Sequence, residues 1–374
     1  MKKIAILGAS FPQRRLVEQA KRMSIETHVF AWDKGNIVKD IADYCYPIST
    51  LDKEAILEKC LEIKIDGILT VGSDIAVDTV NYVADKLSLV GNSMDTSMIC
   101  RDKHLMRSSF KTNGIPSIKF QLIKTEKDLE KTDLKYPFMV KATDRSGSRG
   151  VTRVNNLEEA KVAFKEALEV SLNKKVIIEE YFEGVQYSME MISQNNKHYF
   201  AGITEEFYTG PPYFVEKAHV VPGRIDEKLL LKAINLTKDT LTALKFENGA
   251  SHTELRINEN NEFCIIEVAG RMGGDFRAEM VENAYSYNYL EDTIKIALGI
   301  GIEKVKNVPV QFSFVKWILN KADKELLNDL SSYNILDKNI YGEINESEIQ
   351  SSEFRMGYVL GTSKSFPNIV LNKK

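Results

Sequence analysis

The segment SHTELRINENNEFCIIEVAGRMGG, residues 251–274, decides the fold, because two apolar runs flank a polar turn at Asn258–Asn261. This pattern predicts an antiparallel hairpin in which Glu254 pairs with Ile265. Glu267 would then be a diagonal neighbour of Glu254 on the same face, at roughly 7–8 Å between backbones. The hairpin therefore predicts two carboxylates close together on one wall of a sheet.

Alternation along the second strand also places Ala269 and Arg271 on the face of Glu267. Two acids that converge in this way can share a cation, and Mg²⁺ prefers oxygen ligands from carboxylates and phosphates. A row of surface ion pairs is the alternative interpretation.

A second hairpin is predicted earlier in the chain, where YPFMVKA (136–142) and VTRV (151–154) flank a loop rich in glycine, serine and arginine. Small residues allow close backbone approach, and amides, hydroxyls and cations bind phosphate. The loop after Lys141 therefore suggests a phosphate-binding tip. A flexible surface turn is an equally good interpretation of this stretch alone.

The first hundred residues alternate apolar strands with amphipathic helices, beginning with KIAIL at Lys3–Leu7. Repeated βα units predict a doubly wound parallel sheet. Gly8 and Asp33 are the only support for a nicotinamide dehydrogenase, because the complete glycine fingerprint is missing. The glycine is better explained as part of a βα turn.

Composition excludes several other classes. The 374 residues are 43% hydrophobic and 28% charged, with a net charge of −3, so no nucleic-acid partner is indicated. The four cysteines are far apart, which argues against zinc or a disulfide framework. No signal peptide or membrane span is recognised, and a cytoplasmic location is the expectation.

Two further stretches carry candidate residues. The strand KVIIEEYFEG (175–184) runs into acidic and aromatic residues that could contact an adenine ring. The loop 209–223 is stiffened by prolines around Glu216 and His219. Glu216 could bind an amino group, and His219 could bind a carboxylate or the second substrate. A surface turn and a structural histidine are the respective alternatives.

The order of these motifs resembles the ATP-grasp superfamily, and within it the carboxylate–amine ligases of the amino-acid and dipeptide type. The resemblance covers roughly residues 1–299. It implies a pre-ATP-grasp domain at 1–100, a small subdomain at 101–185 with its core at 115–185, a large subdomain at 186–300 and a strand-rich C-terminal part at 301–374. The implied fold class is mixed, with α/β and α+β parts: an N-terminal parallel sheet, then antiparallel sheets.

The resemblance also assigns roles to residues. Glu254 and Glu267 are the implied Mg²⁺ ligands, for one or two ions, with Mn²⁺ as a substitute, and Arg271 is the implied catalytic clamp. Glu216, His219, Gly273 and Gly274 are the implied substrate contacts. The implied ATP-binding residues are Lys103, Lys141, Ser146, Gly147, Ser148, Gly150, Glu179, Glu180, Phe182 and Gln186.

The chain departs from the family pattern at two positions. Ala269 stands where the family often has an asparagine ligand for the metal, so one ion would bind more weakly or with water. Gln186 stands where the family has an acid for the ribose, and it can hydrogen-bond a hydroxyl without carrying charge.

The implied activity is ATP-dependent amide formation from a small carboxylate and an amine, through an acyl phosphate, with release of ADP and phosphate. A homodimer is usual among such relatives. The alternatives are a bicarbonate-activating enzyme of the biotin carboxylase or carbamoyl-phosphate type, and an ATP-binding module without catalytic activity.

Overall fold

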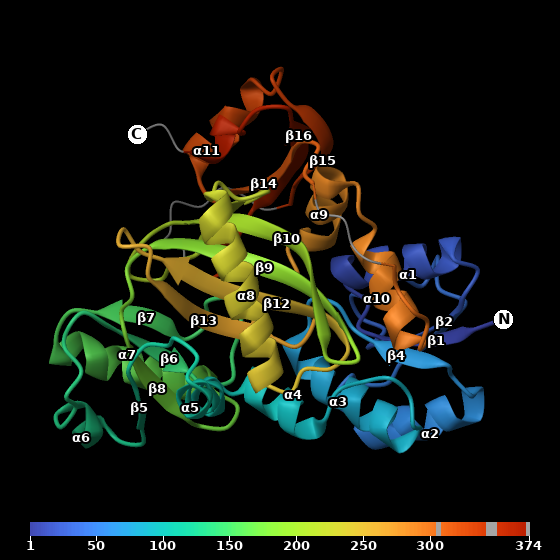
Figure 1. Ribbon diagram of the computed structural model, residues 1–374, viewed down its shortest axis with the longest axis horizontal. Coiled ribbons are helices and arrows are strands. Elements are labelled where there is room, and N and C mark those ends of the chain that lie inside the picture. Colours follow the sequence, from blue (N-terminus) through green and yellow to red (C-terminus); the bar gives the residue numbers. More distant parts are fainter. Residues whose placement is uncertain (304–307, 342–349, 372–374) are drawn as a thin grey trace.

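The computed structural model describes residues 1–303, 308–341 and 350–371, and Figure 1 shows its three sheets. The remaining stretches of the predicted C-terminal part lie outside the described residues. The mixed α/β class is confirmed, with one parallel sheet at the N-terminus and two antiparallel sheets after it. The domain boundaries given above stay predictions.

The N-terminal domain is a parallel sheet with strand order β3-β2-β1-β4, flanked by helices. The first helix buries an apolar stripe that includes Leu16, Val17 and Ala20. The elements are β1 (Lys3–Leu7), α1 (Phe11–Arg22), β2 (Glu26–Phe30), β3 (Tyr44–Tyr46), α2 (Lys53–Ile63), β4 (Gly67–Leu69), α3 (Asp74–Lys86) and α4 (Met94–Arg101).

The small subdomain is a four-stranded antiparallel sheet with order β5-β8-β6-β7. The predicted hairpin around the glycine-rich loop is confirmed, because Lys141 pairs with Val151 across β6 and β7. The elements are α5 (Lys103–Asn113), β5 (Phe120–Ile123), α6 (Glu126–Leu129), β6 (Phe138–Ala142), β7 (Val151–Val154), α7 (Leu157–Val170) and β8 (Val176–Glu180).

The large sheet has eight strands in the order β13-β12-β9-β10-β11-β14-β16-β15, so the C-terminal strands extend it rather than forming a sheet of their own (Figure 1). Its elements are β9 (Val185–Gln194), β10 (Lys197–Tyr208), β11 (Glu216–Val221), α8 (Glu227–Ala243), β12 (Gly249–Ile257), β13 (Phe263–Ala269), α9 (Arg277–Tyr285), α10 (Tyr289–Ala297), β14 (Phe312–Ile318), α11 (Lys321–Glu325), β15 (Asn334–Ile340) and β16 (Gly357–Ser363). Short 3₁₀ turns lie at η1 (Leu326–Asn328), η2 (Ser352–Phe354) and η3 (Asn368–Val370).

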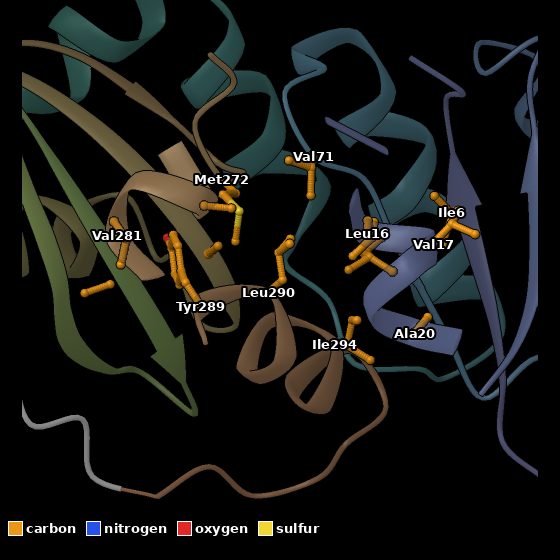
Figure 2. Close-up of a cluster of buried hydrophobic side chains, with 14 of the residues drawn as sticks. Ile6, Leu16, Val17, Ala20, Val71, Met272, Val281, Tyr289, Leu290 and Ile294 are labelled. Carbon is orange, nitrogen blue, oxygen red and sulfur yellow. The ribbon is translucent and has the colours of Figure 1, made fainter. Parts of the chain in front are cut away.

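The N-terminal domain is joined to the large sheet by one continuous apolar core (Figure 2). In this cluster Leu16 of α1 lies near Leu290 and Ile294 of α10, and Val71 lies beside Met272. Burial of large apolar side chains contributes roughly 1.5–3 kcal/mol each. The core therefore fixes the loop after β4 against the loop after β13. Among the described residues, no helix combines the length and apolar character needed to cross a bilayer.

Candidate active site

A cavity of about 280 Å³ lies where the N-terminal domain, the small subdomain and the large sheet meet. Its wall includes Asp74 from the N-terminal domain, Lys103 from the small subdomain and Ser352 from the C-terminal part. The predicted site residues that line it are Lys103, Lys141, Ser146, Gly147, Ser148, Phe182, Gln186, Glu216, Glu254, Glu267, Arg271 and Gly274. Most of the residues chosen from sequence are therefore brought together in one place.

The hairpin β12–β13 carries the two acids, and its register differs from the prediction. Glu254 pairs with Glu267 rather than with Ile265, which pairs with Leu255. The turn is one residue longer than predicted, since Ile257 pairs with Phe263, and a β-bulge follows Glu254. The acids are therefore direct neighbours rather than diagonal ones.

Lys103 reaches the cavity from the first turn of α5. Asp102 caps this helix by accepting from the backbone N–H groups of His104 and Leu105. The Lys103 ammonium pairs with Glu267 at 3.1 Å and donates to the Arg145 carbonyl at 2.7 Å. Burial alone would lower the pKa of Lys103, but the nearby carboxylates, Glu267 first and then Glu179 and Asp74, together raise it. The lysine therefore stays charged beside an acid of the hairpin.

Lys141 is held by Glu179, which lies behind the cavity wall rather than at its surface. The Glu179 carboxylate is fully buried and contacts Lys141 at 2.7 Å and Arg107 at 2.8 Å. Burial would raise the pKa of Glu179, yet the two cations, Arg107 first, lower it to about 2. This acid fixes the lysine, and it is not itself among the lining residues.

The glycine-rich loop supplies Ser146, Gly147 and Ser148 to the wall, whereas Gly150 lies outside it. Gly150 has φ +65°, and a Cβ there would lie 2.6 Å from Val170 Cγ2. Gly150 therefore allows the β6–β7 hairpin to pack closely against α7. The loop tip is thus carried on a turn that requires glycine.

At the predicted hinge, Phe182 and Gln186 line the cavity and Glu180 does not. Glu180 continues the β5–β8 edge, with its backbone N–H bonded to the Lys119 carbonyl at 2.9 Å. The Gln186 amide donates to Glu254 Oε2 at 2.8 Å and to the Tyr208 hydroxyl at 2.6 Å. Gln186 therefore lines the cavity and also orients the carboxylate of Glu254.

His252 contributes a positive charge next to Glu254. Its Nδ1 contacts Glu190 at 2.5 Å, and its Nε2 lies 3.7 Å from Glu254 Oε1. Burial would lower the pKa of His252, but the Glu190 and Glu254 carboxylates together raise it to about 10. Burial likewise opposes the charged form of Glu254, and His252 helps to lower the pKa of that acid.

Glu254 and Glu267 fit a magnesium ion that is completed by phosphate oxygens. Both carboxylates face one cavity that also holds Lys103 and Lys141, and one or two carboxylates plus phosphates is the usual magnesium set. No group of three acidic, histidine or cysteine ligands occurs among the described residues, so the protein alone does not form a closed metal cage there.

Glu216 and His219 both lie on β11, but only Glu216 lines the cavity. Glu216 pairs with Arg355 at 2.6 Å. Burial raises the pKa of Glu216 to about 7 despite that arginine. His219 is buried behind the wall, in contact with Arg277, and burial strongly lowers its pKa. The predicted substrate contact at His219 is thus placed outside the lining.

Arg271 and Gly274 line the cavity, whereas Gly273 does not. Arg271 pairs with Asp74, which the sequence reasoning missed, as it missed the lining residue Arg277. A signal for Asp74 was present: it follows β4 at the carboxyl edge of a parallel sheet, where ligands bind in open α/β folds.

Comparison with known proteins gives a family match and several structural relatives. Residues 134–279 match the model of the ATP-grasp domain. The chain is 26% identical over 272 residues to an alanine–anticapsin ligase of Bacillus subtilis, covering 63% of this chain and 57% of that protein. It therefore spans less than two thirds of the length of this curated relative.

Solved structures share the fold over nearly the whole chain. An L-amino acid ligase from Bacillus licheniformis superposes with a TM-score of 0.84 at 21% identity, covering 98% of this chain and 94% of that one. An N5-carboxyaminoimidazole synthetase from Staphylococcus aureus in complex with ADP gives 0.77 at 19% identity, covering 97% and 93%. These findings confirm the resemblance stated from the sequence: residues 134–279 match the ATP-grasp domain, and the fold of the chain is that of the solved ligase structures.

Proposed function

We propose that the protein is an ATP-dependent carboxylate–amine ligase that joins amino acids or dipeptides through an acyl phosphate, releasing ADP and phosphate. The observation that carries this proposal is the direct pairing of Glu254 and Glu267 in the cavity that also holds Lys103 and Lys141. Two adjacent acids flanked by two cations suit a metal-bound triphosphate. The names of the alanine–anticapsin ligase and the L-amino acid ligase support the choice of substrates.

In this proposal the protein acts mainly by positioning and charge stabilisation. Lys103 and Lys141 neutralise phosphate oxygens, and the amides and hydroxyls of residues 146–148 enclose them. Glu254 and Glu267 would hold Mg²⁺, which supplies charge neutralisation at the phosphates when it is bound. Phe182 and Gln186 contact the nucleoside, and Glu179 acts by holding Lys141.

The substrate carboxylate attacks the γ-phosphorus, ADP leaves, and the amine then displaces phosphate from the acyl carbon. Arg271, with the backbone near Gly274, stabilises the acyl phosphate, and Glu216 binds an ammonium group of the substrate. Water would hydrolyse the intermediate, so closure of the glycine-rich loop protects it. The proposal includes a cytoplasmic location and a homodimer.

A phosphate-release screen over pairs of amino acids with Mg-ATP tests the proposal, with mass spectrometry of the amide product. Phosphate release that requires both a carboxylate and an amine, and that Glu267→Gln abolishes, is the expected result. Bicarbonate-dependent ADP formation without amide would support the bicarbonate-activating alternative. ATP binding with no turnover under any condition would favour the non-catalytic module.

A further inference from the structure

Asp74 belongs to the N-terminal domain, yet its carboxylate reaches the cavity. It begins α3, directly after the loop that follows β4. This loop is fixed against the large sheet, since Gly72 N donates to the Met272 carbonyl at 3.3 Å and Val71 shares a buried cluster with Met272 (Figure 2). The position of Asp74 relative to the loop after β13 is therefore set by packing.

The Arg271 guanidinium is held from two sides. Nη2 donates to Asp74 Oδ2 at 2.8 Å, and Nη1 donates to the Met272 carbonyl at 3.1 Å. Within the described part of the chain, the buried Nε has no hydrogen-bond partner. The guanidinium is thus oriented by the protein and still has N–H groups to offer an anion in the cavity.

The surroundings of Asp74 keep it charged. Burial would raise the pKa of Asp74, but the Arg271 guanidinium, Lys103 and the Ser146 hydroxyl together lower it below its usual value. A carboxylate with a lowered pKa is a poor carrier of protons near neutral pH. The role that remains for Asp74 is to orient its partner.

We propose that Asp74 is a positioning residue that aims Arg271 at the phosphoryl group and so makes the N-terminal domain part of the reaction centre. This inference rests on the proposed function. It extends that function to a residue outside the segment 134–279 that matches the ATP-grasp domain. A guanidinium that turns freely on its side chain would spend less time in the productive geometry, and small misplacements in an active site cost rate.

A double-mutant cycle tests the inference with Asp74→Asn, Arg271→Lys and the double variant. Lysine keeps the charge but lacks the planar fork that Asp74 aligns. We expect Asp74→Asn to lower kcat by about 10–100-fold, with the KM for ATP changed by less than about threefold. In the Arg271→Lys background, Asp74→Asn should lower kcat hardly any further, because the effects of substitutions at two coupled residues are not additive.

Asp78 provides a matched control. It lies one turn further along α3 and pairs with Arg101 at 2.6 Å, outside the cavity lining. Asp78→Asn removes the same kind of ion pair from the same helix, and kcat should stay within about twofold of the parent. The inference would be overturned if Asp74→Asn lowered kcat equally in the parent and in the Arg271→Lys variant, or if it left the kcat of the parent unchanged.

A binding measurement separates this inference from the proposed function. If the parent protein forms no ADP with any carboxylate and amine, the proposed function fails. Calorimetric titration of inorganic phosphate into the MgADP-loaded protein then decides the role of Asp74. We expect phosphate affinity to fall at least about tenfold in Asp74→Asn, as in Arg271→Lys. Unchanged or tighter binding in Asp74→Asn, or no phosphate binding by the parent, would contradict it.

Discussion

Glu254 and Glu267 lie directly opposite each other on β12 and β13, because a β-bulge follows Glu254 and shifts the register of the strands. Both side chains line the same cavity. Without a cation between them, two opposed carboxylates would repel. Lys103, at 3.1 Å from Glu267, and the protonated His252 near Glu254 offset part of this repulsion.

Replacing either acid by glutamine should therefore weaken the binding of magnesium in the active site. For Glu254→Gln and Glu267→Gln we expect kcat/KM to fall by about a hundredfold or more, equivalent to ~2.7 kcal/mol of transition-state stabilisation. The magnesium concentration for half-maximal rate should rise. Steady-state kinetics over a magnesium series checks both. Glu262→Gln, on the exposed turn of the same hairpin, is the control and should behave like the parent.

Glu179→Gln should destabilise the small subdomain, because it leaves the Arg107 and Lys141 cations without their buried partner. Breaking a buried ion pair from one side costs about 3–5 kcal/mol. Urea denaturation measures the loss. With a folded pKa of about 2, Glu179 contributes stability above pH 4.5 that is lost only as the pH falls toward 2.

The exposed neighbour Glu183 is the control for this experiment, and Glu183→Gln should change the free energy of unfolding by less than about 0.5 kcal/mol. Equal stability of Glu179→Gln and the parent would show that the buried contacts do not stabilise the fold.

Because of His252, the free energy of unfolding should depend on pH in the neutral to alkaline range. The pKa of His252 is raised to about 10 by Glu190 and Glu254, from 6.5, so its contribution is complete below pH 6.5 and lost as the pH rises through 10. The difference in unfolding free energy between the parent and His252→Gln should shrink over this range. His198 is the contrast, because burial lowers its pKa to about 4 and His198→Gln should show no such trend above pH 7.

Because of Glu216, kcat/KM for a substrate that carries an ammonium group should depend on pH near neutrality. Burial raises the pKa of Glu216 to about 7, so the carboxylate that binds a cation forms as the pH rises through that value. We expect kcat/KM for such substrates to increase with pH there. Glu216→Gln should remove the inflection and lower kcat/KM by about 10–100-fold, as for loss of a charged hydrogen bond.

The same shift has a stability consequence of defined sign. Because the folded pKa of Glu216 is raised, its contribution to stability is complete below pH 4.5 and is lost as the pH rises through about 7. Glu227→Gln, at an exposed position, should leave both profiles unchanged. An inflection that persists in Glu216→Gln would assign it to another group.

The hairpin illustrates how far sequence reasoning reached. Alternation correctly placed Glu254 and Glu267 on one face, because side-chain direction in a strand depends only on local geometry. The pairing with Ile265 was wrong, because the turn length and the bulge depend on how two strands and their neighbours fit together. The predicted hinge at Glu179 shows the same limit, since Arg107 comes from a separate helix.

The sequence by itself determined the type and order of the elements and the residue types available for chemistry, since hydrophobic periodicity and turn residues act over a few positions. Only the tertiary structure decided which charged groups meet. Asp74 and Arg271 are 197 residues apart, and Glu216 and Arg355 are 139 apart. Such contacts arise because separate domains pack through a shared core, and packing over that distance leaves no periodic trace in the chain.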